Sequence, residues 1–127
     1  MVDLIDTIVY AGRLKDKSAL MSSSSGGAFT ALSDAFLKSR DAVVAAVYNY
    51  ENHTVEFQMI LDEKQRERAK GSKYMQSKPG DIYQKAYRWL MDNPKKELLF
   101  VGMGCQSDGF RKFSEIKGIR DRVYIVD

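Results

Sequence analysis

The sequence predicts a single α/β domain, or an α+β one, in which helices flank a mixed sheet of about five strands. The segment 42–48 is an apolar run with three valines, which is typical of a central strand covered on both faces. Between 97 and 126 the order strand, glycine turn, helix, strand favours parallel pairing. With 127 residues, 44% of them hydrophobic, the chain is long enough to bury a core without disulfides. We therefore expect residues 1–127 to form one domain.

The N-terminal third is expected to contribute a strand and a helix. Residues 7–14 form a short apolar run that is typical of a strand, and the polar residues 15–18 then turn the chain. A helix is expected over 28–37, where apolar residues recur at helical spacing. These residues would form its buried face: Ala28, Leu32, Ala35 and Phe36.

The segment 42–61 predicts a β-hairpin. Turn-forming residues at 49–52 separate the first strand from a second one at 53–61, which alternates apolar and polar side chains and so has one buried face. The apolar face consists of Val55, Phe57, Met59 and Leu61. The charged run 62–70 follows, with acids first and bases last, and predicts a solvated helix whose charges match the helix dipole.

The C-terminal half is expected to contain two helices and two strands. The residues at 77–79 mark the start of a helix, and those at 92–94 stop it. Its buried face would hold Ile82, Ala86, Trp89 and Leu90. The buried strand 97–101 then runs into a glycine turn, a short helix over 106–113 and a last strand at 122–126.

Charge and composition exclude several classes of protein. The net charge is +3, and the basic residues are dispersed, without the concentrated stripe of a nucleic-acid-binding surface. No apolar run is long enough to span a membrane, and Asp3 and Asp6 stand where a signal peptide has basic residues. We therefore expect a cytoplasmic protein with no membrane insertion and no nucleic-acid partner. One cysteine and one histidine exclude a disulfide framework and a local zinc motif.

A serine- and glycine-rich loop precedes the helix expected over 28–37. Its candidate binding residues are Ser24, Ser25, Gly26 and Gly27. The first N–H groups of a helix have no intrahelical acceptor, so a helix that starts directly after such a loop can bind a phosphate. The alternative is a flexible loop or linker without a ligand.

A second polar loop, Gly71 to Ser77, offers a hydroxyl on Ser72, a cation on Lys73 and an aromatic face on Tyr74. This set could hold a phosphate or carboxylate together with a planar ring. One alternative is that the loop is only a surface turn between two helices. Another is that Tyr74 belongs to the core.

The third loop, 102–106, contains the single cysteine at the end of a buried strand. Cys105 would lie at a helix N-terminus, which lowers the pKa of a thiol and favours the nucleophilic, metal-binding thiolate. The alternative is an inert buried thiol. Since ligands of such sheets bind outside the carboxyl ends of the strands, we expect the three loops to converge on one site.

Together these loops resemble the coenzyme F-420 hydrogenase/dehydrogenase beta-subunit family. The resemblance covers nearly the whole chain. In order, it runs through Tyr10-Ala11-Gly12-Arg13 with Lys15-Asp16, Ser24 to Leu32, Gly71-Ser72-Lys73-Tyr74-Met75-Gln76-Ser77, and Leu99 to Gly102 with Cys105-Gln106 and Gly109-Phe110.

The resemblance implies a redox function. Members of the family are electron-transfer proteins that contain flavin and iron–sulfur clusters, so the resemblance implies a cleft for FAD or FMN. It implies cofactor contacts from the loop Ser24 to Gly27 and from Ser72, Lys73, Tyr74, Gln76 and Ser77. It also makes Cys105 a candidate cluster ligand, and other redox subunits or a ferredoxin-like domain candidate partners.

Two features of this chain depart from the family pattern. Met103 and Gly104 precede Cys105 where the family commonly has a proline before the cysteine. The family's further cysteines are missing, and a cluster needs about four ligands, so an iron–sulfur cluster is expected only in the full-length protein. Because the sequence stops at Asp127, directly after a strand, we expect it to be a fragment of a longer protein.

Three functional hypotheses follow. The first is a flavin-dependent electron-transfer domain of an oxidoreductase, inactive as a fragment, in which Lys73 adds charge and Tyr74 packs near the ring. The second is a non-catalytic scaffold or partner-binding domain of a redox complex. The third, a thiol enzyme that uses Cys105, is disfavoured because His53 lies on a distant strand.

Overall fold

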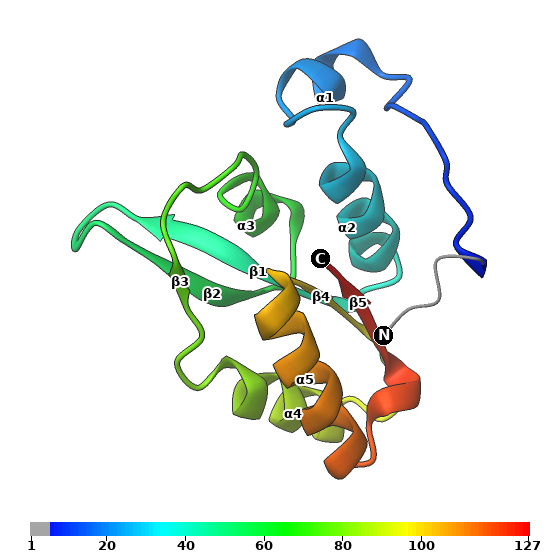
Figure 1. The fold of residues 1–127 in the computed structure, drawn as a ribbon, viewed down its shortest axis with the longest axis vertical. Helices are drawn as coiled ribbons and strands as arrows, with labels where there is room; N and C mark the ends of the chain where they lie inside the picture. The colour runs from blue at the N-terminus through cyan, green and yellow to red at the C-terminus, as the bar shows by residue number, and fades with distance from the viewer. Residues whose placement is uncertain (1–5) are drawn as a thin grey trace.

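The computed structural model describes residues 6–127 and shows one α/β domain with a five-stranded mixed sheet, as the sequence predicts. Helices cover both faces of this sheet (Figure 1). The elements are α1 (Lys17–Met21), α2 (Ala28–Lys38), β1 (Ala42–Asn49), β2 (Thr54–Ile60), α3 (Glu63–Glu67), β3 (Ser77–Lys78), α4 (Ile82–Asp92), β4 (Leu98–Val101), α5 (Gly104–Ile116), a 3₁₀ turn (Arg120–Arg122) and β5 (Val123–Val126).

The strand order is β3-β2-β1-β4-β5, which places β1 at the centre. The predicted hairpin is confirmed, since β1 pairs antiparallel with β2 from Val43↔Ile60 to Asn49↔Thr54. The predicted parallel unit is confirmed as well, because β4 and β5 pair in parallel and α5 connects them. β1 also pairs in parallel with β4, and their pairing ends at Val44↔Phe100.

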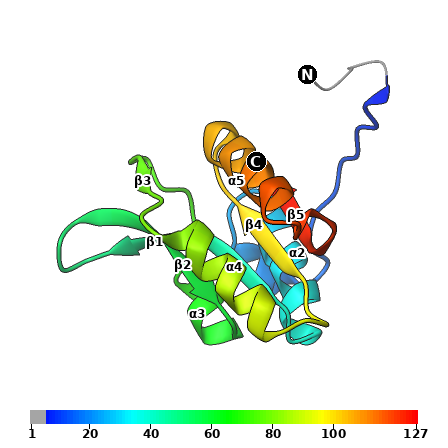
Figure 2. The ribbon, with the colours of Figure 1, turned by 90° about the horizontal axis from the view of Figure 1, so that it is seen from below.

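Two apolar clusters hold the three layers together. On one face, α4 and α5 pack against the sheet through Ala86, Leu90 and Phe110, which belong to one apolar cluster with Phe100 of β4. On the other face, α2 and the segment after α3 cover β1 and β4 (Figure 2). β1 is buried on both faces at Ala42 to Ala45, as the run of apolar residues predicts.

The strand predicted over 7–14 is wrong. No strand pairing in the described chain includes these residues, and Val9 and Tyr10 are exposed. The segment runs outside the sheet (Figure 1), where the N–H of Leu14 donates to the carbonyl of Gly26 at 2.9 Å. β5 and the short β3 are the edge strands of the sheet, and β3 is not predicted from the sequence. A strand is defined by backbone pairing with another strand, and residues 7–14 pair with none of the five.

The helix predicted over 28–37 is confirmed as α2, and Phe36 of its predicted buried face packs against the core, but the other three residues of that face do not. Leu32 is 40% exposed, and Ala28 and Ala35 are exposed too. The helix buries Thr30 and Ser33, and Phe29 and Leu37 pack against the core together with the predicted Phe36. Both sets have helical spacing, so periodicity alone could not choose between them.

The charged run after β2 forms a shorter helix than predicted, and it is not wholly solvated. Asp62 caps α3 by accepting a hydrogen bond from the N–H of Gln65 at 2.8 Å. Arg66 is only 6% exposed, because its guanidinium forms an ion pair with Asp34 of α2 at 2.6 Å. This pairing of an α2 carboxylate with an α3 guanidinium explains why α2 turns polar residues inward.

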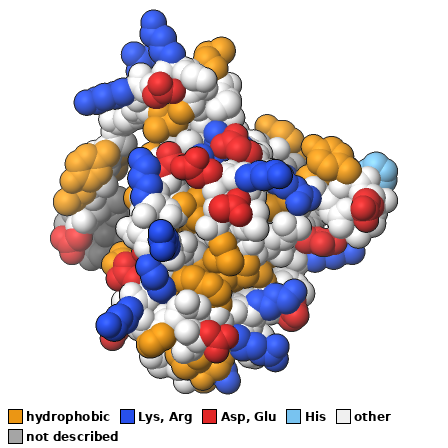
Figure 3. Space-filling view, turned by 180° about the vertical axis from the view of Figure 1, so that it is seen from behind, with side chains coloured by type: hydrophobic (Ala, Val, Ile, Leu, Met, Phe, Trp, Pro, Cys, Tyr) orange, Lys and Arg blue, Asp and Glu red, His pale blue; other side chains and the backbone are white. Residues whose placement is uncertain are grey.

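The remaining elements follow the predictions with shifted ends. α4 buries Ile82, Ala86 and Leu90 with Trp89 partly buried, as predicted. α5 is longer than the predicted 106–113, and Leu61 is exposed because β2 ends at Ile60. Within residues 6–127, no helix combines the length and the apolar character needed to cross a membrane. Acidic and basic side chains are interspersed over the face seen in Figure 3.

Candidate functional site

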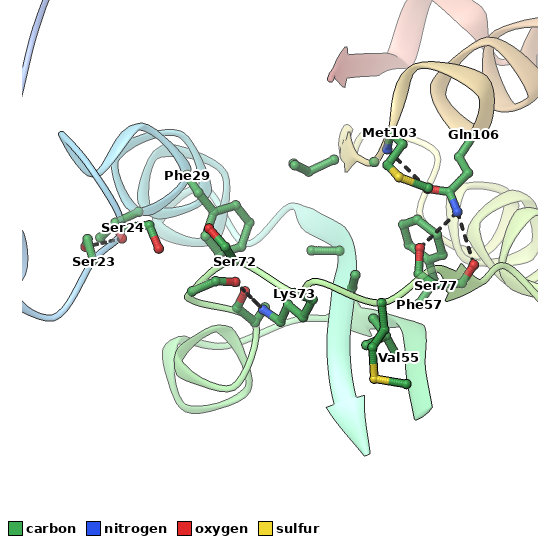
Figure 4. Close-up of a pocket in the computed structure, with 18 of the residues that line it drawn as sticks. Ser23, Ser24, Phe29, Val55, Phe57, Ser72, Lys73, Ser77, Met103 and Gln106 are labelled. Carbon is green, nitrogen blue, oxygen red and sulfur yellow. Dashed lines mark hydrogen bonds between the residues drawn. The ribbon is translucent and has the colours of Figure 1, made fainter. Parts of the chain in front are cut away.

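The three predicted loops meet around a single cavity of about 310 Å³ (Figure 4). The serine loop contributes Ser23, Ser24 and Gly27 to its wall. The second loop contributes Gly71, Ser72, Lys73, Met75 and Ser77, and the third contributes Gly102, Met103 and Gln106. The convergence of these loops, which are far apart in the sequence, is therefore as expected.

The floor of the cavity is apolar and lies along the central strand. Pairing between β1 and β4 stops at Val44, whereas β1 continues to Asn49, so its edge beyond Val44 is not covered by β4. The small side chains of Ala45 and Ala46 leave space there, and Val55 and Phe57 of β2 complete the floor. This place, beyond the carboxyl end of β4, is where α/β sheets commonly bind ligands.

The N-terminus of α2 forms one wall. Its N-cap residue Gly27 has a φ of 80° and no side chain, and no side chain in residues 6–127 caps the helix. The first backbone hydrogen bond of α2 runs from the N–H of Ala31 to Gly27, so the preceding N–H groups are available to a ligand. Because Phe29 and Thr30 of this turn line the cavity, an anion there would meet free donors and the positive end of the helix dipole.

The two glycines of the serine loop are needed for packing. A Cβ on Gly26 would lie 2.6 Å from the carbonyl oxygen of Gly12, and one on Gly27 would lie 2.4 Å from Leu14 Cδ1. The segment before α1 therefore presses directly on this loop. Gly26 and Ser25, which has a φ of 51°, do not line the cavity, whereas Ser24 and Gly27 do.

Lys73 is the one charged residue among the described residues that line the cavity. Its Nζ donates to the carbonyl oxygens of Ala69, of Lys70 at 3.0 Å and of Gly71 at 2.9 Å. Burial lowers the pKa of Lys73 below its ordinary value. In this geometry Lys73 holds the second loop closed, and a contact with a phosphate would require it to leave these carbonyls.

The other predicted residues of the second loop differ in their placement. Ser72 and Ser77 line the cavity, but Gln76 is exposed and does not. The alternative that Tyr74 belongs to the core is wrong, because its side chain is 96% exposed. Tyr74 lies outside the cavity and lines a neighbouring groove.

Gln106 connects the second and third loops, and it was not among the predicted site residues. Its Nε2 donates to the hydroxyl of Ser77 at 2.9 Å and to its carbonyl at 3.2 Å, while its Oε1 accepts from the N–H of Met103 at 3.1 Å (Figure 4). The hydroxyl of Tyr83 donates to the Gln106 carbonyl at 2.7 Å, and burial raises the pKa of that phenol. The sequence does hold a signal for this role, because glutamine is favoured at the third position of a helix, where it caps the helix start. Using this signal requires placing the start of α5 at Gly104.

The predicted site also lacks several residues that line the cavity, namely Phe29, Thr30, Met75 and the floor residues. Their signal was only their position beside the polar loops, since apolar side chains carry no chemical signature of a ligand.

Cys105 lies in the first turn of α5, as predicted, but its thiol is exposed and does not line the cavity. The alternative of a buried thiol is therefore wrong. Residues 6–127 contain no group of three or more histidine, cysteine or acidic side chains that could hold a metal ion. His53 hydrogen bonds with the Tyr48 hydroxyl at 3.0 Å, at the hairpin and away from Cys105.

Comparison with known proteins shows a shared fold. No protein-family model matches the chain, and no curated protein matches it. Among solved structures, it is similar to a chain of the F420-reducing [NiFe] hydrogenase complex from Methanosarcina barkeri, with a TM-score of 0.68 and 20% sequence identity. The match covers 87% of this chain and 39% of the hydrogenase chain. The chain thus has the fold of part of a subunit of that multi-subunit hydrogenase complex.

Proposed function

We propose that the chain is a flavin-binding domain of an electron-transfer protein, with the ring of FAD or FMN in the cavity. The observation that carries this proposal is the meeting of three loops around an apolar floor, beside an uncapped helix N-terminus. The fold shared with a hydrogenase chain and the resemblance of the loops to a flavin-containing family support it.

The cavity suits the two chemical halves of a flavin mononucleotide. A planar isoalloxazine ring requires apolar walls, which Ala45, Ala46 and Phe57 supply. A phosphate requires N–H donors, which the first turn of α2 supplies next to the hydroxyl of Ser24. The volume of about 310 Å³ lies at the lower end of the ~300–1,000 Å³ typical of ligand pockets. It therefore suits the ring and its nearest substituents, and a whole dinucleotide would extend beyond it.

The residues of this chain would bind, orient and shield the cofactor. When bound, a flavin supplies hydride and single-electron transfer. Gln106 is held rigidly by Ser77 and Met103 and so presents a fixed wall to the ring, while Phe29 and Met75 exclude water from the cavity. The exposed Cys105 would serve as a cluster ligand only where a longer chain or a partner redox subunit supplies the further cysteines.

The experiment that tests this function is a titration of the 127-residue chain with FMN and with FAD, followed by flavin fluorescence and melting temperature. Binding should raise the melting temperature, because a ligand that binds only the folded state stabilises it. Ser24→Asp should weaken flavin binding by about tenfold or more, since it places a negative charge at the proposed phosphate site. The matched control is Ser25→Asp, which adds the same charge one residue away, outside the cavity lining.

Equal losses of flavin affinity in Ser24→Asp and Ser25→Asp would show that the phosphate does not bind at the N-terminus of α2. Absence of binding by the wild-type chain to either flavin would contradict the proposal itself.

A second candidate function is a scaffold that binds a partner subunit. The exposed apolar face of α2, formed by Ala28, Leu32 and Ala35, favours it. A scaffold of this kind would bind no flavin, and Leu32→Glu would weaken its association with its complex. A flavin site would be unaffected by that change, because Leu32 does not line the cavity.

A further inference from the structure

The segment 8–13, which we call the N-terminal arm, carries large apolar side chains that face solvent. Ile8, Val9 and Tyr10 are 73%, 87% and 86% exposed. The arm is held at its C-terminal end, where the N–H of Leu14 donates to the carbonyl of Gly26, and from there it extends away from the rest of the domain (Figure 2). Adjacent exposed apolar side chains mark a surface that contacts a partner.

The edge strand β5 offers backbone groups that an added strand can bond. In the part of the chain that the structure describes, β5 pairs only with β4. The carbonyl of Val126 accepts from the N–H of Gly102 at 3.1 Å, so the backbone groups of Val126 point toward β4. Because these groups alternate along a strand, those of Val123 and Ile125 point outward from the sheet.

Arg120 covers the first of these two outward positions. Its Nη1 donates to the carbonyl of Val123 at 2.7 Å, and the N–H of Val123 donates to the carbonyl of Arg120. The N–H and carbonyl of Ile125 bond to no group within residues 6–127. A strand added to this edge is therefore centred on Ile125.

Charge selects the direction of the added strand. With Val9 opposite Ile125 in parallel pairing, Asp6 falls beside Arg122, whose guanidinium bonds to backbone carbonyls and to no carboxylate of the described chain. An antiparallel strand centred on the same residue would bring Asp6 next to Asp127 instead. Like charges at neighbouring positions destabilise strand pairing, so the parallel direction is favoured.

The same register extends the apolar face of β5 that lies toward α2. Tyr124 and Val126 are on this face, where the Tyr124 ring meets Phe36 edge to face with centroids 5.3 Å apart. Tyr124 is still 49% exposed. Ile8 would lie beside Tyr124 and Tyr10 beside Val126, because residues opposite each other in a parallel pair share a face. The added strand would thus cover both itself and the open side of β5.

We propose that two copies of this chain exchange their N-terminal arms, each arm adding to β5 of the other copy as a parallel sixth strand. The occupant is a second copy because the arm is directed away from its own sheet (Figure 2). One chain carries both the strand and the edge that receives it, so reciprocal exchange closes a two-fold dimer. The inference is independent of flavin binding, since the arm does not line the cavity.

The first test measures dimerisation of the 127-residue chain by analytical ultracentrifugation over a dilution series. In the proposed register the N–H of Tyr10 donates to the Ile125 carbonyl of the other copy, whereas the N–H of Val9 points away. Tyr10→Pro should therefore weaken dimerisation by about tenfold or more relative to Tyr10→Ala, since proline has no N–H to donate. The matched control is Val9→Pro against Val9→Ala, where the difference should be much smaller because proline is tolerated at such positions.

The second test locates the arm by a disulfide between Ile8→Cys and Tyr124→Cys, in a chain that also carries Cys105→Ser. The two cysteines should link separate copies, at a higher yield than either single cysteine gives, because the register places them side by side. Ile8→Cys with Met91→Cys, at an exposed position of α4, is the control pair and should not exceed the single cysteines.

A dimer that proline weakens at position 10 and not at position 9, linked between copies by the first cysteine pair, would support arm exchange. A chain that is monomeric at every concentration would overturn it. So would equal effects of proline at the two positions, or a disulfide that forms within one copy.

Discussion

At the scale of single residues, the serine-glycine loop shows how packing and binding are divided between neighbours. Ser24 and Gly27 line the cavity, while Gly26 and Ser25 do not. Gly27 has a left-handed backbone with a φ of 80°, and Leu14 packs where its side chain would be. The sequence motif groups these four residues, but only the structure separates those that line the cavity from those that do not.

Gly27→Ala should destabilise the chain more than Gly71→Ala does. Both glycines have a positive φ, 80° and 86°, so each substitution costs about 1 kcal/mol in backbone strain. A Cβ at Gly27 would also meet Leu14 at 2.4 Å, whereas nothing lies within 4 Å of a Cβ at Gly71. The extra cost at Gly27 should be about 1 kcal/mol or more in the free energy of unfolding, measured with urea. Equal losses would show that Leu14 yields without cost.

Among the helices and strands, the buried face can be predicted from sequence where the apolar residues define a single face, and it cannot where they define two possible faces. α4 and β1 present one apolar pattern each, and both were predicted with their buried residues. α2 has two apolar faces. Which of them is buried depends on Arg66, which lies 32 residues from its partner Asp34 in the sequence. A buried charge in a charged run leaves no local signal, because its partner lies on another element.

Arg66→Ala should destabilise the chain by about 2 kcal/mol. The guanidinium joins α3 to α2 through hydrogen bonds to Asp34 at 2.6 Å, the Thr30 carbonyl at 3.2 Å and the Ser33 hydroxyl at 3.3 Å. The Asp34 side chain is 29% exposed and partly hydrated, which keeps the cost below that of a fully buried pair. Arg88→Ala, at an exposed site, should change the free energy of unfolding by less than about 0.5 kcal/mol. A loss of that small size in Arg66→Ala would mean that the α2–α3 link is dispensable.

Glu67 should make stability depend on acid pH. The hydrogen bond from Lys70 lowers the pKa of Glu67 below its ordinary value of 4.5. Because the folded state favours the charged carboxylate, this contribution is present above pH 4.5 and is lost as the pH falls through the lowered pKa. The wild-type chain should therefore be more stable than Glu67→Gln at neutral pH, and the difference should vanish in stronger acid. Urea denaturation across this range measures it, and a difference independent of pH would contradict the assignment.

At the scale of the whole molecule, the sheet brings together loops that the sequence separates. The short pairing of β4 with β1 ends at Val44 and leaves room at the centre of the sheet, and α2, the segment after α3 and the start of α5 close around that space. Their convergence could be predicted, because strand ends share an edge. The lining from Ala45 and Phe29 could not be predicted, because it depends on how far each strand extends and how each helix is rotated.

We propose that the three loops form one flavin site. Its most direct test is to follow the backbone amide NMR signals of the ¹⁵N-labelled chain while FMN is added. We expect saturable shifts at four residues that line the cavity, Gly27, Phe29, Ser72 and Gly102, and unchanged signals at Gly118, beyond the end of α5. Shifts confined to another surface, or no shifts at millimolar FMN, would contradict it.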